Sequence, residues 1–222
     1  MTRPARNSRL ALPPILLAFI LCGAATAAPR YKILQNFRGP NGDRDWGGVI
    51  LDGRGNVFGA TPFGGGSGCY GYGCGLVFEL APRPGGRWQF AALYKFGSGE
   101  NGATPYGRPT LDAAGNIYGT TQQDGLYHDG TAFELTPGPG GWTETTLFNF
   151  CPKMGESGCE DGGGTQAGLL RDTKGNLYGT KQGGGGYPGN VFALTPGADG
   201  WTETMLTNSP ATTATAPLPM PD

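Results

Sequence analysis

A recurring element with a 60-residue period is the feature that most constrains how this chain can fold. Residues 51–59 (LDGRGNVFG) return as residues 111–119 (LDAAGNIYG) and again as residues 171–179 (RDTKGNLYG). Two further signatures follow in every copy: VFEL, AFEL and VFAL at residues 77–80, 132–135 and 191–194, then WQF, WTE and WTE at residues 88–90, 142–144 and 201–203. A fixed period of this length is typical of a repeat architecture in which each unit is one supersecondary module.

Each copy is predicted to consist of β-strands. The chain contains 43 Gly and 19 Pro, which interrupt it too often for ordinary helices, and its apolar runs are short and rich in β-branched and aromatic residues. In the first copy the expected strands are Gly48–Asp52, Asn56–Thr61, Leu76–Leu80 and Trp88–Phe96. The Asp-x-x-Gly-Asn segment between the first two strands is a tight-turn signal.

The predicted fold class is therefore all-β, with tandem four-stranded antiparallel repeats arranged like the blades of a β-propeller. Strand four carries apolar residues on both faces, which is typical of sheets stacked against one another. Residues 31–37 resemble strand four and are expected to add a strand before the first repeat. Because propellers usually close with four to eight blades, three repeats are expected either to form an incomplete array or to self-associate through exposed strand edges.

The first 27 residues are expected to be a cleavable secretory signal. Arg3, Arg6 and Arg9 precede an apolar stretch over residues 10–21, and Ala25-Thr26-Ala27 supplies a small-residue cleavage site. We therefore expect a signal peptide over 1–27, a β domain over 28–206 with repeats at about 38–96, 97–150 and 151–206, and a disordered tail over 207–222 that is rich in Pro, Thr and Ala. The predicted location is extracellular or at the cell surface, with the periplasm as the alternative.

Charge and hydropathy exclude several classes of partner. The chain has 16 Lys and Arg against 17 Asp and Glu, and removal of the three N-terminal arginines leaves 13 against 17, a net charge of −4. A nucleic-acid partner would need a clustered basic face, so none is expected. No stretch after the signal approaches 18 apolar residues, so no membrane span is expected either.

The repeat motifs resemble a known family. The [LR]-D-x-x-G-N-[VIL]-[FY]-G-[AT], V-F-x-L-T-P and W-T-E-T-x-L elements, spread over residues 31–206, resemble the GloVer (Gloeo/Verruco) tandem repeat of exported bacterial proteins that carry varied C-terminal anchors. The resemblance implies a secreted or surface-displayed, propeller-like array and carries over no catalytic residue. The chain departs from that pattern in having three copies, no visible anchor after Leu206, and a third copy without the aromatic ending of residues 147–150.

Four cysteines follow the signal, and they are expected to form two local disulfides. The spacings are Cys-x4-Cys for Cys69 and Cys74 and Cys-x7-Cys for Cys151 and Cys159. An even number of cysteines in an oxidising compartment favours disulfides over a zinc site with His128, the only histidine. Crosslinks between the two loops are the main alternative pairing.

The candidate ligand-binding residues lie on the two long loops of each repeat. In an antiparallel meander, alternate connections lie at the same end of the sheet, so loops two–three and four–one share one face. That face is expected to carry Trp46, Tyr70, Tyr72, Tyr106, Tyr127 and Tyr187, with Asp43 and Asp45 as polar contacts. Variable loops on a rigid scaffold commonly bind ligands, although these rings could equally pack their own Gly-rich loops.

We therefore predict an exported binding or surface-interaction module, with a glycan or a peptide as ligand and no cofactor or metal. The alternatives are a secreted carbohydrate-active enzyme that uses two carboxylates of the loop face and a purely structural array. The sequence contains no nucleophile-elbow or phosphate-loop motif, so no catalytic residue is assigned. The repeated aspartates Asp52, Asp112 and Asp172 are interpreted as turn-stabilising residues rather than as a catalytic set.

Overall fold

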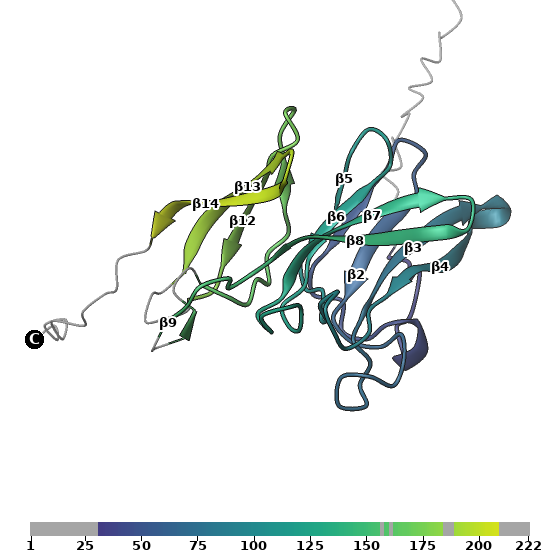
Figure 1. Ribbon diagram of the computed structural model, residues 1–222. Helices are drawn as coiled ribbons and strands as arrows, with labels where there is room; N and C mark the ends of the chain where they lie inside the picture. Colours follow the sequence, from purple (N-terminus) through teal and green to yellow (C-terminus); the bar gives the residue numbers. More distant parts are fainter. Residues whose placement is uncertain (1–30, 156–157, 160–161, 184–188, 209–222) are drawn as a thin grey trace, which may run out of the picture. The chain divides into compact units, whose positions relative to one another are not determined.

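The computed structural model describes residues 31–155, 158–159, 162–183 and 189–208 (Figure 1). The chain divides into Met1–Lys32, of which two residues are described, and Ile33–Asp222, which holds all the described strands. The expected signal peptide and most of the expected tail thus lie outside the described residues. Among the described residues, no helix has the length and apolar character needed to cross a membrane.

Three four-stranded antiparallel sheets make up the described fold, one for each sequence repeat, and in each the strands pair in chain order. Sheet 1 contains β1 (Val49–Leu51), β2 (Val57–Thr61), β3 (Leu76–Arg83) and β4 (Arg87–Lys95); sheet 2 contains β5 (Thr110–Leu111), β6 (Ile117–Thr120), β7 (Thr131–Gly138) and β8 (Gly141–Asn149); sheet 3 contains β11 (Leu170–Arg171), β12 (Leu177–Lys181), β13 (Asn190–Gly197) and β14 (Gly200–Asn208). A two-stranded ribbon of β9 (Met154–Gly155) and β10 (Gly158–Cys159) and the short 3-10 turns η1 (Gly39–Asn41) and η2 (Pro84–Gly86) complete the described elements. The all-β prediction is confirmed, and the open sheets are compatible with propeller blades.

The first hairpin of each sheet is closed by an aspartate, as the sequence predicts. The Asp52 Oδ1 atom accepts hydrogen bonds from the backbone N–H groups of Arg54 and Asn56, both at 2.8 Å, while the Asn56 side chain donates to Oδ2 at 3.0 Å. Asp112 and Asp172 make the same contacts. Gly55 has a φ of 82°, which non-glycine residues rarely adopt, so the Gly of the motif is required by the turn.

The third strand of sheet 1 runs further than the sequence predicts. The expected strand ends at Leu80, but β3 continues through Pro82, which pairs with Trp88 of β4. Beyond Leu80 this strand is paired with β4 alone, because β2 begins at Val57 opposite Leu80. A proline without an N–H group is tolerated where one side of the strand has no neighbour.

The predicted extra strand over Tyr31–Phe37 is wrong. These residues form no strand, because no described strand lies beside them to supply a hydrogen-bonding ladder. Their last residue nevertheless packs as a core residue, since the ring centroid of Phe37 lies 4.8 Å from that of Phe78. At the other end, β14 reaches Asn208 and so includes the first two residues of the segment expected to be disordered.

Each sheet has two apolar faces, which we call the entry face and the exit face. The entry faces carry, sheet by sheet, Val57, Phe78, Leu80 and Trp88; Ile117, Phe133, Leu135 and Trp142; Leu177, Phe192, Leu194 and Trp201. The exit faces carry Phe58, Val77 and Tyr94; Tyr118, Ala132 and Phe148; and, by repeat equivalence, Tyr178, Val191 and Thr207. The exit face of sheet 1 packs on the entry face of sheet 2, and the exit face of sheet 2 packs on the entry face of sheet 3.

A glycine in the second strand makes room for the phenylalanine of the entry face. A Cβ atom added at Gly59, Gly119 or Gly179 would overlap the Phe ring of the adjacent third strand. All three sheets also carry a register shift just before that phenylalanine, between Val77 and Phe78 in sheet 1. The Gly of the [FY]-G element is thus a packing residue.

Candidate binding surface

Backbone hydrogen bonds tie the two long loops of a repeat together at one end of the sheet. The Asp43 N–H donates to the Phe63 carbonyl at 2.9 Å in the first repeat, and the Ala103 N–H donates to the Gln123 carbonyl at 2.7 Å in the second. In each pair the first residue belongs to the loop that enters strand one and the second to the loop that follows strand two. The predicted shared face of the long loops is therefore present in these two repeats.

An aromatic row lies on this face. The ring of Trp46 stacks on that of Tyr106 with centroids 5.5 Å apart and planes inclined by 26°. Phe63 contacts Tyr106 edge-on at 6.3 Å and Tyr72 edge-on at 6.4 Å, while the Arg44 guanidinium lies 5.2 Å from the Phe63 centroid. Trp46 and Tyr72 are each 65% exposed, so the two ends of the row face solvent. We call the four rings of Trp46, Tyr106, Phe63 and Tyr72 the aromatic row.

A hollow of about 280 Å³ lies beside the Trp46 end of the row. Residues from all three repeats line it: Trp46, Gly47, Tyr106, Gly107, Arg108, Gln166 and Gly168. Side chains at Gly47 or Gly107 would collide with the backbone of the next repeat, so these glycines let successive loops approach closely. The hollow therefore offers a flat ring, bare backbone and two polar side chains, Arg108 and Gln166.

The two predicted carboxylates of this region differ in their surroundings. Asp43 is partly exposed and its carboxylate lies 3.8 Å from the Arg44 guanidinium. Burial raises the pKa of the Asp45 carboxyl, and the backbone amides of Gly47 and Gly48 lower it in part. The Oδ1 atom of Asp45 is buried and has no hydrogen-bond partner among the residues that the structure describes.

Tyr70 and Tyr127 do not join the aromatic row. Tyr70, 97% exposed, lines a separate hollow of about 590 Å³ together with Cys69, Ser98, Gln123, Asp124 and His128. Tyr127 belongs to the same loop as His128, and Tyr187 lies outside the described residues. The residues predicted for this face are thus divided between two places: Trp46, Tyr72 and Tyr106 belong to the row, and Asp43 and Asp45 belong to the same loop as Trp46.

Phe63 was missed by the sequence reasoning, although it holds the aromatic row together. It lies two residues after the end of strand two, in the Thr-Pro-Phe segment at residues 61–63, and has no aromatic counterpart in the other copies. The available signal was that a large apolar residue stands in a Gly-rich loop of the predicted loop face.

Ser98, Asp124 and His128 share one hollow but do not form a catalytic triad. The Asp124 carboxylate accepts a hydrogen bond from the Gly99 N–H at 3.3 Å, and the His128 backbone N–H donates to the Gly125 carbonyl. Within the described residues, no side-chain hydrogen bond joins the serine, the histidine and the aspartate. A triad requires the base to bond both the nucleophile and the orienting carboxylate.

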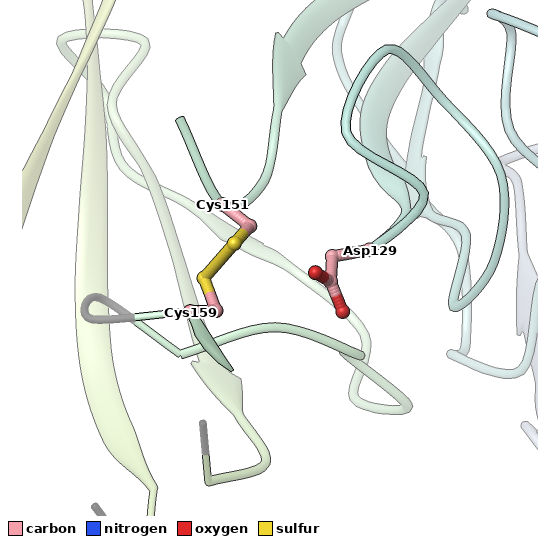
Figure 2. Close-up of side chains that lie close together, drawn as sticks. All are labelled: Asp129, Cys151 and Cys159. Carbon is pink, nitrogen blue, oxygen red and sulfur yellow. A yellow bond between two sulfur atoms is a disulfide. The ribbon is translucent and has the colours of Figure 1, made fainter. Parts of the chain in front are cut away.

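The structure contains the two predicted disulfides, Cys69–Cys74 and Cys151–Cys159, with Cα atoms 5.1 and 5.4 Å apart. Figure 2 shows the Asp129 carboxylate opposite the Cys151–Cys159 bridge. Since both sulfur atoms are bonded to each other, this group does not present the two thiolates that a zinc site would need. The bridge instead fixes the segment that leads from sheet 2 into sheet 3.

Comparison with known proteins identifies the repeat. The model of the Gloeobacter/Verrucomicrobia repeat matches residues 24–218, which include all three copies. The chain belongs to the Gloeobacter/Verrucomicrobia repeat family. No curated protein matches it. The resemblance inferred from the motifs is confirmed, and each repeat of this chain corresponds to one four-stranded sheet.

Proposed function

We propose that this Gloeobacter/Verrucomicrobia repeat protein is an exported binding module and that the aromatic row with its adjoining hollow binds a glycan. The observation that carries the proposal is the Trp46 ring, which is 65% exposed although it stacks on Tyr106 beside the hollow. Burying an indole ring is favourable, and an exposed ring does not contribute this free energy. A ligand that covers the Trp46 ring therefore gains it on binding.

The chemistry of the hollow fits a sugar. The apolar C–H face of a pyranose can lie flat on an indole ring, while its hydroxyl groups need donors and acceptors at the edge. Arg108 supplies donors, Gln166 supplies donors and an acceptor, and the backbone of Gly47 and Gly107, which lines the hollow, offers further groups. The mixed charges of Asp43, Arg44 and Arg108 favour a neutral chain over a polyanion.

The proposal that the protein is exported is supported by the N-terminal segment and by the disulfides. Two disulfides are typical of proteins that fold in an oxidising compartment, and they are compatible with an extracellular location. An extracellular binding module would meet polysaccharides of its own cell surface or of its surroundings.

The test combines glycan-array screening with titration of any hit against ring-deletion variants. We expect Trp46→Ala and Tyr72→Ala each to weaken binding by at least tenfold, about 1.4 kcal/mol, while the melting temperature changes little because both rings are exposed. Tyr31→Ala is the matched control, because Tyr31 is 91% exposed and lies outside the row. Large losses of stability in both row variants would show that the rings are loop packing and would overturn the site.

The same titrations separate the alternatives. Binding of an extended peptide but no glycan would replace the proposed ligand class, and turnover of a bound glycan would favour the carbohydrate-active enzyme. No binding to either class would favour a structural array.

A further inference from the structure

The two junctions between neighbouring sheets are built from the same parts. We call the contact of sheets 1 and 2 the first junction and that of sheets 2 and 3 the second. In each, an exit face packs on the next entry face, and a phenylalanine from just beyond strand four contacts the entry-face phenylalanine of the next repeat. The ring centroids of Phe96 and Phe133 are 5.1 Å apart, and those of Phe150 and Phe192 are 5.3 Å apart. The two junctions can therefore be compared residue by residue.

A hollow of about 640 Å³ lies at the first junction, between the Asp-x-x-Gly-Asn turns of sheets 1 and 2. Alternate connections of an antiparallel meander share one end, so this hollow lies at the end opposite the long loops and the aromatic row. Its apolar wall includes Phe58, Leu111 and Trp142. The hollow is thus separate from the proposed glycan site.

The second junction holds a cation at the corresponding place. The guanidinium carbon of Arg171 lies 5.4 Å from the centroid of the Tyr118 ring. The hydroxyl oxygen of Tyr118 in turn lies 3.1 Å from a carboxylate oxygen of Asp112 and 2.9 Å from one of Glu134. The chain itself thereby brings together a positive group, an aromatic ring and two carboxylates.

The first junction keeps the ring and the carboxylates but not the cation. Phe58 takes the place of the tyrosine and lacks its hydroxyl group, and Leu111 takes the place of the arginine. Glu79 lies directly across the strand pair from Phe58, as the glutamate of the second junction does from its tyrosine. In the part of the chain that the structure describes, the Glu79 carboxylate has no side-chain hydrogen bond and no ion pair. The hollow thus lies where the second junction holds a guanidinium.

The charged groups that line the hollow favour a cation as well. They are the carboxylates of Asp52, Glu79 and Asp112 and the guanidinium of Arg54, so three negative groups stand against one positive group. The three carboxylates do not all lie within 4.8 Å of one another, so they are too far apart to share one metal ion. An organic cation, which can contact them along its length, fits this spacing.

We propose that this hollow binds a guanidinium ligand, the arginine side chain of a peptide or protein, at the place that Arg171 takes in the second junction. A guanidinium can donate two parallel hydrogen bonds to a carboxylate and can also lie flat on an aromatic ring, whereas an ammonium is a compact, strongly hydrated point charge. Glu79 offers the carboxylate, and Trp142 offers a partly exposed ring. The proposal does not depend on the glycan site, which lies at the other end of the sheets.

The test is an NMR titration of the full chain with N-acetyl-arginine amide, whose only charge is the guanidinium. We expect a saturable shift of the Trp142 indole N–H signal. N-acetyl-citrulline amide, which has the same shape without the charge, should bind about tenfold more weakly. Glu79→Gln should weaken binding of the arginine probe by about the same factor. Glu100→Gln is the matched control and should leave binding unchanged, because Glu100 is exposed and lies outside the hollow.

The chain also suggests a variant that closes the site. Leu111→Arg introduces the guanidinium of the second junction and should abolish binding of the arginine probe without lowering the melting temperature. Leu111→Met, an uncharged replacement of similar size, should retain binding. Equal binding of the arginine and citrulline probes, or no saturable shift up to about 20 mM probe, would show that the proposal is wrong. Undiminished binding to a folded Leu111→Arg variant would contradict it as well.

Discussion

At the scale of single residues, the repeated aspartates show how position decides the role of a carboxylate. Burial alone would raise the pKa of Asp112, but hydrogen bonds from Asn116, Tyr118 and Ala114 together lower it. The pKa values of Asp52 and Asp172 are lowered in the same way, against burial, by hydrogen bonds in which Asn56 and Asn176 take part. Asp45 has the opposite shift, because burial outweighs its backbone hydrogen bonds.

The turn aspartates predict how stability depends on pH. Because folding lowers their pKa, the stabilisation is present above the unfolded value of about 3.9 and is lost as the pH falls through the lower folded value. We expect Asp112→Ala to lower the free energy of unfolding at pH 7 by about 1 kcal/mol, the net contribution of hydrogen bonds to a partly exposed group. Between neutral pH and about pH 3, the variant should lose less further stability than the parent protein. Urea denaturation at both pH values measures this, with Asp199→Ala in the exposed β13–β14 turn as control. An equal acid loss in parent and variant would contradict the assignment.

At the scale of elements, sheet 3 differs from the others by a buried ion pair. The Lys181 ammonium lies 2.7 Å from the Glu203 carboxylate, with the two side chains 0% and 8% exposed. It also lies 5.2 Å from the Phe150 ring centroid and 5.7 Å from that of Phe192. The two opposite charges are thus paired inside the protein, where removing one of them leaves the other in a costly environment.

Removing one partner of this ion pair should lower the free energy of unfolding more than replacing both partners does. Sheet 1 carries Thr61 and Phe90 at the equivalent positions. Lys181→Thr alone leaves Glu203 as a buried charge and is expected to cost about 3–5 kcal/mol in the free energy of unfolding. The double variant Lys181→Thr with Glu203→Phe restores the sheet 1 combination and should recover most of that loss. Denaturant unfolding of the two single variants and the double variant measures the coupling, and additive losses would refute it.

At the scale of the whole molecule, three sheets with two internal junctions account for the described part of the chain. Both faces of sheet 2, the exit face of sheet 1 and the entry face of sheet 3 are buried at these two junctions. Stability therefore depends on neighbours rather than on any one repeat, as in other linear arrays.

The N-terminal segment is expected to be absent from the exported protein. Cleavage after Ala27 would make Ala28 the first residue and would remove Cys22, leaving only the four cysteines that form disulfides. Intact-mass measurement of the exported protein tests this. A mass that retains Cys22 with an attached acyl chain would show lipid anchoring instead.

The sequence predicted those features of the fold that depend on local pattern. The 60-residue period, the Asp-x-x-Gly-Asn turns and the cysteine spacings each involve neighbouring residues, and the structure contains all of them. The extra strand over residues 31–37 failed because a strand needs a partner, which no local pattern reveals. The contact of Phe63 with Tyr106 likewise joins loops of two repeats, so only the packing of those loops could place it.

The phenylalanine at each junction has a consequence for how such an array can change length. Phe37, Phe96 and Phe150 each complete the core of the sheet that follows them, so the unit that packs begins with that phenylalanine and ends just before the next one. If a duplication or deletion has its boundary just before this phenylalanine, every remaining sheet still has its junction phenylalanine and a matching neighbour. The same event cut at the edge of a sheet would leave one core without its aromatic ring. Arrays of this kind can therefore gain or lose repeats in evolution without new compensating substitutions, provided that recombination respects this boundary.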